Sequence, residues 1–210
     1  MKDAAQDARY LIDCGYPKES AVRFVSDHYR LPEEQRFVLT RVVVASGSAV
    51  KRKEKRTHVE TLRGRVLFID GYNVLISVES LLAGKQVYLC DDGFIRDTQG
   101  IFNSYRMSHL TKVALSAVFD LLAWACLGQA EVLLDQQISM SGQLAAMTRQ
   151  VMAEHRIPGT ARTMQNVDRQ LKECGGIVAT GDGNVIDAAD EVLDIPAEIA
   201  RRLGLKPLIL

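Results

Sequence analysis

The chain has 210 residues, of which 47% are hydrophobic and 25% charged, and this composition excludes a disordered or fibrous protein. It leaves room for one ordinary domain plus a small appendage. The formal net charge is zero, but residues 1–60 carry 12 basic against 9 acidic residues, and residues 61–210 carry 14 against 17. No apolar stretch predicts a membrane span, and the four cysteines lack the CxxC spacing of a zinc cluster. We therefore expect a cytoplasmic protein from a reducing compartment.

The first 46 residues have the apolar periodicity of three helices. Gly15-Tyr16-Pro17 separates the first helix from the second, and Leu31-Pro32 begins the third. The pattern breaks at residues 45–48, and a basic stretch follows as far as Gly64. We therefore predict a small all-helical N-terminal domain with a basic linker over residues 1–60.

The strongest local charge feature is the basic run Lys51-Arg52-Lys53-Glu54-Lys55-Arg56. Such a run can contact nucleic-acid phosphates, which makes Lys51, Arg52 and Lys53 candidate substrate-binding residues. It can equally be a solvated helix face or a linker, because short basic runs are ordinary on protein surfaces. The sequence leaves both interpretations open.

From Gly64 onwards, short apolar runs alternate with helical patterns. The predicted strands cover residues 66–69, 131–134, 160–164, 177–180 and 192–195. The predicted helices cover residues 73–82, 108–127, 142–154, 167–174, 185–189 and 197–203. Strands separated by helices of this length imply right-handed βαβ units. The expected fold class over residues 64–210 is therefore α/β, with a mostly parallel sheet flanked by helices.

Some polar residues are interpreted as structural. Residues 86–96 predict a β-hairpin, and Asp91, Asp92 and Asp97 are typical of its turn. The four histidines lie in predicted helices or in the linker, and no Ser-His-Asp or Cys-His arrangement is evident. We interpret the histidines as surface or core residues.

Acidic residues recur at the ends of the predicted strands. Asp70 and Asp135 end two of them, Asp182 lies just beyond a third, Asp168 opens a short helix, and Asp187 follows Asp182 by about one turn. Ligands of open parallel sheets bind at this edge. Carboxylates gathered there repel, by about 4 kcal/mol for two charges some 4 Å apart, and a hard cation such as Mg²⁺ or Mn²⁺ relieves the repulsion. Each aspartate alone is equally well explained as a helix N-cap, but their recurrence at one edge favours a metal site.

The segment Ser139-Met140-Ser141-Gly142 lies between a predicted strand and a helix. The hydroxyls of Ser139 and Ser141, with the free amides of a helix N-terminus, are able to hold a phosphate. A plain serine N-cap is the simpler interpretation, and we favour it.

Two motifs resemble the NYN branch of the PIN-like nucleases. Phe68-Ile-Asp-Gly-Tyr-Asn-Val-Leu75 resembles its opening strand and Asp-Gly-x-Asn motif, and Ile177-Val-Ala-Thr-Gly-Asp-Gly-Asn-Val-Ile186 resembles its later strand and Ser/Thr-Gly-Asp motif. The second motif departs from the family at Gly183-Asn184, where a further aspartate is more usual and where Asp187 is a candidate to compensate. The resemblance implies a PIN-like, Rossmann-like fold with metal ligands Asp70 and Asp182, Asn73 as the residue that orients the first, and additional acids Asp168 and Asp135.

The whole chain resembles a prokaryotic two-part family. Residues 10–29 resemble the domain of unknown function 434, and Leu134-Asp-Gln-Gln-Ile-Ser-Met-Ser-Gly142 resembles its usual partner, the domain of unknown function 5616. This resemblance covers nearly all of the chain. It implies the two-part layout but says little about activity.

The expected function is that of a Mg²⁺- or Mn²⁺-dependent endoribonuclease, with RNA as its partner. A non-catalytic nucleic-acid or protein binding module with a degenerate PIN-like site is the alternative. A phosphatase of the haloacid dehalogenase type is less favoured, because Asp70-Gly-Tyr72 lacks the second acid of that mechanism. The oligomeric state, monomer or homodimer, is left open.

Overall fold

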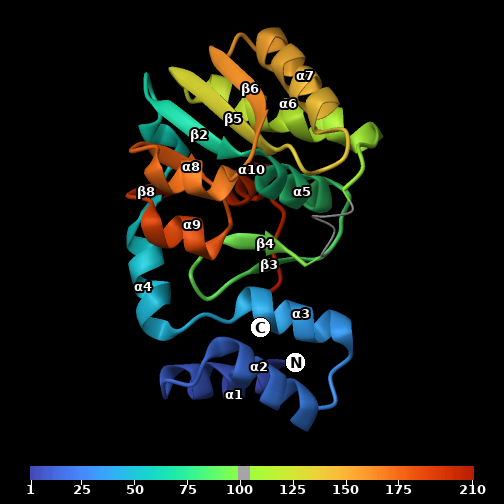
Figure 1. The fold of residues 1–210 in the computed structure, drawn as a ribbon, viewed down its shortest axis with the longest axis vertical. Helices are drawn as coiled ribbons and strands as arrows, with labels where there is room; N and C mark the ends of the chain where they lie inside the picture. Colours follow the sequence, from blue (N-terminus) through green and yellow to red (C-terminus); the bar gives the residue numbers. More distant parts are fainter. Residues whose placement is uncertain (99–104) are drawn as a thin grey trace.

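A six-stranded parallel sheet forms the centre of the fold (Figure 1), in a computed structural model that describes residues 1–98 and 105–210. The sheet consists of β1 (Arg56–Thr57), β2 (Val66–Asp70), β5 (Gln129–Asp135), β6 (Gly159–Met164), β7 (Ile177–Ala179) and β8 (Glu191–Leu193). The strand order is β1-β8-β7-β2-β5-β6, and every neighbouring pair is parallel. The α/β class and the mostly parallel sheet expected from the sequence are therefore confirmed.

The chain changes direction across the sheet at β2. From β2 it continues to β5 and β6 on one side, and it then returns to β7 and β8 on the other. Such a switch point leaves a crevice at the carboxyl ends of the two strands beside it. Asp70 ends β2, and Thr180 and Asp182 follow β7, so both motifs identified in the sequence end at this crevice.

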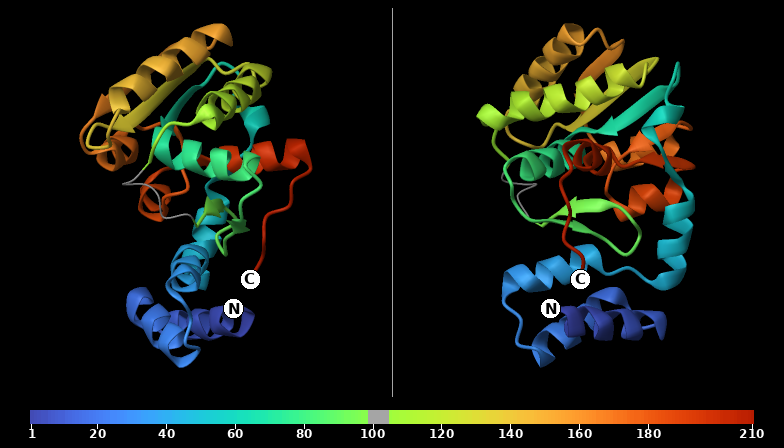
Figure 2. Two further views of the ribbon diagram at one scale, coloured as in Figure 1. Left: turned by 90° about the vertical axis from the view of Figure 1, so that its right-hand side faces the viewer. Right: turned by 180° about the vertical axis from the view of Figure 1, so that it is seen from behind.

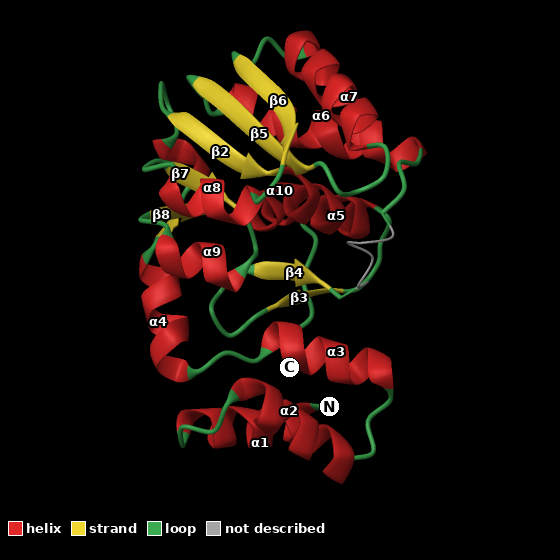
Figure 3. Ribbon diagram, in the orientation of Figure 1, coloured by secondary structure: helices red, strands yellow, loops and turns green. Residues whose placement is uncertain are grey.

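Helices cover both faces of the sheet, as Figure 3 shows. The larger core lies on the face covered by α5 (Gly71–Leu82), α6 (His109–Trp124), α7 (Ser141–Glu154) and α10 (Ile195–Leu203). The smaller core lies beneath α8 (Val167–Glu173) and α9 (Gly183–Ala188). The apolar side chains of the strands alternate between these two cores, as expected for strands buried on both faces. Within the described residues, none of the helices is long and apolar enough to cross a membrane.

The predicted hairpin is present as β3 (Val87–Leu89) and β4 (Ile95–Asp97), an antiparallel pair outside the main sheet. Asp91 and Asp92 lie in its turn, as predicted. The turn assignment is wrong for Asp97, a buried residue of β4 that accepts a hydrogen bond from the Ser77 hydroxyl at 3.1 Å. Its place in a strand follows from the register of the hairpin, which pairs Val87 with Asp97.

The N-terminal helices lie beyond this hairpin, with α3 between it and the α1–α2 pair (Figure 2). The three predicted helices are α1 (Lys2–Asp13), α2 (Lys18–His28) and α3 (Glu33–Val42). The break predicted at residues 45–48 is instead the start of α4 (Ser46–Glu54). Asp13 explains this start, because its carboxylate accepts hydrogen bonds from the Ser46 amide at 2.8 Å and the Ser46 hydroxyl at 2.6 Å. The basic run therefore lies mostly on a helix, and η1 (Val59–Thr61) follows β1.

Gly159, the first residue of β6, provides a test of the close pairing between β6 and β5. Its φ of +124° is rarely adopted by residues with a side chain, and a Cβ there overlaps the Ala130 carbonyl of β5. We predict that Gly159→Ala lowers the free energy of unfolding by roughly 3 kcal/mol in urea denaturation. Gly142→Ala is the control, because Gly142 is helical with open space around it and the change is expected to be neutral or slightly stabilising. Equal stability of the two variants contradicts this β5–β6 pairing.

Candidate active site

A cavity of about 690 Å³ opens at the carboxyl ends of the central strands. Its lining includes four of the aspartates selected from the sequence, together with two acids that were not selected: Asp70, Asp135, Asp168 and Asp182, then Asp97 and Glu173. Asn73 lines it as well. The strand-end pattern thus identified residues that share one cavity, although they are up to 112 positions apart in the chain.

Asp70 is deeply buried, with 7% of its surface exposed. One carboxylate oxygen accepts a hydrogen bond from the Thr180 hydroxyl at 2.9 Å, and the other caps α5 through the Asn73 amide at 3.4 Å. Burial raises the pKa of Asp70 to about 7. The two hydrogen bonds oppose this increase, and the negative charges of Asp168 and Asp182 add to it. Asp70 is therefore a carboxyl group whose ionisation is unfavourable unless a cation is nearby.

Asn73 connects the two motifs. Its side-chain oxygen accepts a hydrogen bond from the Gly181 amide at 2.7 Å, so that α5 holds the loop after β7. In that loop the Thr180 hydroxyl accepts from the Asp182 amide at 3.0 Å. Asp182 in turn caps α9, accepting from the Asn184 amide at 2.8 Å and the Val185 amide at 3.1 Å. The side chain of Asn73 thus positions the loop that carries Asp182, while the backbone amide of Asn73 donates to Asp70.

Asp168 and Asp135 complete the acidic wall of the cavity. Asp168 lies in the first turn of α8, and partial desolvation raises the pKa of its carboxyl group. The charges of Asp182 and Asp135 raise this pKa further, whereas that of Lys172 lowers it. Asp135 ends β5, and its carboxylate accepts from the Gln137 amide at 2.8 Å. The charges of Asp168 and Asp182 act on Asp70, and those of Asp182 and Asp135 act on Asp168. The four aspartates therefore interact electrostatically.

The acids surround the cavity but do not converge on one point. Within residues 1–98 and 105–210, no three acidic, histidine or cysteine side chains lie close enough together to ligate one ion directly. A calcium-type cage of six to eight protein oxygens is therefore absent from this part of the chain. Mg²⁺ needs fewer protein ligands, because it retains several waters and is commonly held by one or two carboxylates plus substrate phosphates.

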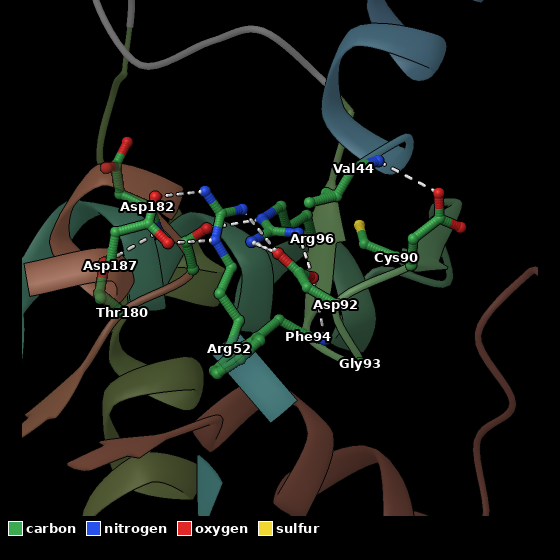
Figure 4. Close-up of polar contacts among 12 residues, drawn as sticks. Val44, Arg52, Cys90, Asp92, Gly93, Phe94, Arg96, Thr180, Asp182 and Asp187 are labelled. Carbon is green, nitrogen blue, oxygen red and sulfur yellow. Dashed lines mark hydrogen bonds and ion pairs between the residues drawn. The ribbon is translucent and has the colours of Figure 1, made fainter. Parts of the chain in front are cut away.

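Asp187 and the basic run lie outside this cavity. The Arg52 guanidinium donates to both oxygens of Asp187, at 2.7 and 2.8 Å, and to Asp92 at 2.9 Å (Figure 4). These hydrogen bonds lower the pKa of Asp187. Lys51 and Lys53 are exposed on α4, away from the cavity lining. The structure therefore pairs Arg52 with Asp187, and neither residue lines the cavity that the four aspartates share.

Ser139 and Ser141 also lie away from the cavity lining. Ser139 is exposed, and Ser141 is the buried first residue of α7, whose hydroxyl lies 3.5 Å from the Gln136 carbonyl. The serine N-cap favoured from the sequence is wrong. The N-cap position belongs to Met140, which has a φ of 64° and makes no side-chain capping bond.

A buried ion network holds the β7–α9 loop from behind. Arg96 donates through Nε to the Gly181 carbonyl at 2.6 Å and through its two terminal nitrogens to Asp92 at 2.8 and 2.7 Å (Figure 4). Burial alone would raise the pKa of Asp92, but hydrogen bonds from Arg96 and Arg52 lower it. The loop that carries Asp182 is thus fixed by Asn73 on one side and Arg96 on the other.

The sequence patterns did not identify several residues of the cavity lining, among them Asp97, Phe37 and Arg41. Asp97 ends β4, an antiparallel strand outside the parallel sheet, so the strand-end rule applied to the other aspartates does not cover it. Phe37 and Arg41 come from α3, and only the docking of the N-terminal helices brings them to this lining. No local sequence signal marks either of them.

The metal-free protein provides a test of the buried carboxylate. The pKa of Asp70 is about 7 in the folded chain and near 4 in an unfolded one. Asp70 therefore lowers the free energy of unfolding increasingly as the pH rises from 4 to 7, and by a constant amount above pH 7. We predict that Asp70→Asn, measured by urea denaturation in a chelator, stabilises the protein by up to about 4 kcal/mol at pH 8. The gain shrinks towards zero at pH 4. Asp190→Asn, an exposed control, has little effect. A gain in stability that is equal at pH 4 and pH 8 contradicts a raised pKa for Asp70.

Comparisons with known proteins identify the family. Residues 59–198 match the family described as "Domain of unknown function (DUF5616)", and residues 1–55 match "Protein of unknown function (DUF434)". The chain is 33% identical over 208 residues to the uncharacterized protein MJ0935 of Methanocaldococcus jannaschii. The matched region covers 98% of this chain and 99% of that protein. No solved structure matches. The chain belongs to the DUF5616 family and carries a DUF434 segment at its N-terminus.

Proposed function

We propose that the protein is a Mg²⁺- or Mn²⁺-dependent nuclease that cleaves RNA, built on a PIN-like sheet. One observation carries the proposal: Asp70 is buried in the lining of a cavity that Asp168 and Asp182 share, and among the described residues no basic side chain pairs with it. Burying such a carboxylate destabilises the chain unless something binds there. The position of the cavity at the switch point of a parallel sheet supports the same conclusion.

The donor set fits a hard cation. Asp70 and Asp182 are the residues that would hold it, because both are fixed by hydrogen bonds from the chain and both line the cavity. When bound, such an ion neutralises phosphate charge and promotes attack by water. Asp168, with its raised pKa, is suited to accept a proton from that water, and Asp135 adds negative charge near it. Asn73 and Arg96 act by positioning, since they hold the loop that carries Asp182.

The alternative is a nucleic-acid or protein binding module with a degenerate site. The absence of a direct three-ligand group within residues 1–98 and 105–210 is the observation in its favour. The haloacid dehalogenase alternative has less support, because Tyr72, buried in α5, stands where that mechanism needs its second acid.

RNA cleavage tests the proposal. We expect the wild-type protein to cut a labelled single-stranded RNA in Mn²⁺ or Mg²⁺ and to lose the activity in a chelator. Asp182→Asn should reduce the rate by at least about 100-fold, because it removes a charge that holds the ion. Asp190→Asn is the control and should cut like the wild type.

Two results contradict the nuclease. Cleavage that persists in Asp182→Asn at the wild-type rate indicates a contaminating enzyme. Binding of Mn²⁺ without cleavage of any RNA favours the binding module.

A further inference from the structure

The cavity has a second wall, contributed by the N-terminal helices. Phe37 and Arg41 of α3 line it together with the aspartates of the α/β part. They are four residues apart on one helix, so their side chains lie on the same face. Phe37 is partly buried, and the Arg41 side chain is 27% exposed. An aromatic ring and a guanidinium group thus face the acidic site from a separate segment of the chain.

The docking of α3 is specific. Val38 and Val42 pack against Tyr88 and Cys90 of the hairpin, and the Val42 carbonyl accepts a hydrogen bond from the Asp91 amide at 3.1 Å. This contact fixes α3 on the hairpin side that faces α1 and α2 in Figure 1. The position of Phe37 and Arg41 is therefore set by the fold.

The same turn is anchored to α1. The Asp91 carboxylate accepts two hydrogen bonds from Arg9, at 2.9 and 2.8 Å, and one from the Val44 amide at 3.1 Å. Arg9 also donates to the Leu210 carbonyl at 3.2 Å, so the end of the chain joins this contact. The N-terminal helices and the α/β part are thus held together at the turn of the hairpin.

Arg41 differs from the other arginines near the site. Arg52 and Arg96 use their guanidinium groups in several hydrogen bonds each, all of 2.6–2.9 Å. Arg41 has one ion pair, with Asp97 at 3.9 Å, and its buried Nε has no hydrogen-bond partner among the described residues. A buried guanidinium N–H without an acceptor is unfavourable. Because 27% of the Arg41 side chain is exposed and its ion pair with Asp97 is long, the guanidinium group is able to bind a phosphate, whose oxygens planar guanidinium groups hold in pairs.

Helix α8 also brings basic residues to the cavity. Lys172 and Arg169 of α8 line the cavity, and Arg169 is paired with Glu173 at 2.9 Å. Acids therefore line the strand-end part of the cavity, with basic side chains on α3 and α8. A chain of phosphates can follow the basic residues and present one linkage to the acids. The cavity volume is within the range, roughly 300–1,000 Å³, of sites for small ligands, which suits one or two unpaired nucleotides.

We propose that α3 forms half of the substrate site, with Phe37 stacking on an unpaired base and Arg41 binding a phosphate of single-stranded RNA. This inference rests on the proposed nuclease function and specifies its substrate. Stacking on aromatic rings is the usual way in which proteins hold unpaired bases, because every base has a flat face. The N-terminal segment is thereby a functional part of the site.

The test is fluorescence anisotropy with a labelled 12-nucleotide RNA, single-stranded or paired, in Ca²⁺ to prevent cleavage. We expect Phe37→Ala and Arg41→Ala each to weaken single-strand binding about tenfold. Arg41→Ala should also reduce the salt dependence by about one phosphate contact, whereas Phe37→Ala should leave it unchanged. Phe24→Ala and Arg23→Ala, exposed on α2 outside the cavity lining, are matched controls and should bind like the wild type.

Further variants separate packing from recognition. Phe37→Leu keeps an apolar side chain but cannot stack, and it should bind as weakly as Phe37→Ala. Wild-type affinity in the α3 variants, or equal binding of paired and single-stranded RNA, overturns the inference. Calorimetry with Mn²⁺ distinguishes the two proposals, since Arg41→Ala should still bind the metal. Binding of RNA that depends on Phe37 and Arg41 in a protein that binds no Mn²⁺ supports the RNA contact of α3 and contradicts the nuclease.

Discussion

The candidate site depends on the contact between the ends of β2 and β7. Thr180 donates a hydrogen bond to Asp70, and Asn73 accepts one from Gly181, so the strand-end loop of β7 is tied to the first turn of α5. These neighbouring strands lie far apart in the sequence, and the parallel sheet brings their ends to one crevice. Without this contact, Asp70 and Asp182 would be two unrelated helix caps.

The hairpin supports that contact from the other side. Arg96 binds Asp92 and the Gly181 carbonyl, and Arg52 continues the network to Asp187. Buried ion pairs of this kind contribute little net stability, because desolvation offsets their attraction, but they define one geometry. Removing one partner leaves an uncompensated buried charge, which is costly. The hairpin, α4 and α9 are thereby fixed relative to the cavity, as is the wall that α3 supplies.

Local patterns predict most of this architecture. Short apolar runs identify the buried strands, and the periodicity of apolar residues identifies the helices between them. The same logic identified Asp70, Asp135 and Asp182, since the end of a parallel strand is a defined place in a sheet, whereas Asp168 was selected as the acid that opens a short helix. It did not work for Asp187, because the partner that removes it from the cavity, Arg52, lies 135 residues earlier. The start of α4 was missed for a similar reason, since its capping acid belongs to another helix. Long-range pairings of this kind leave no periodic signal.

The central claim is that Asp70 and Asp182 hold one divalent cation. Its most direct test is anomalous X-ray diffraction from crystals of the full chain grown with Mn²⁺. We predict a single strong anomalous peak in the cavity, at roughly 2.1 Å from a carboxylate oxygen of each residue, with waters completing the octahedron. The peak should be absent in Asp70→Asn. A peak elsewhere on the protein, or none at millimolar Mn²⁺, contradicts the metal site and leaves the cavity to a ligand without a metal.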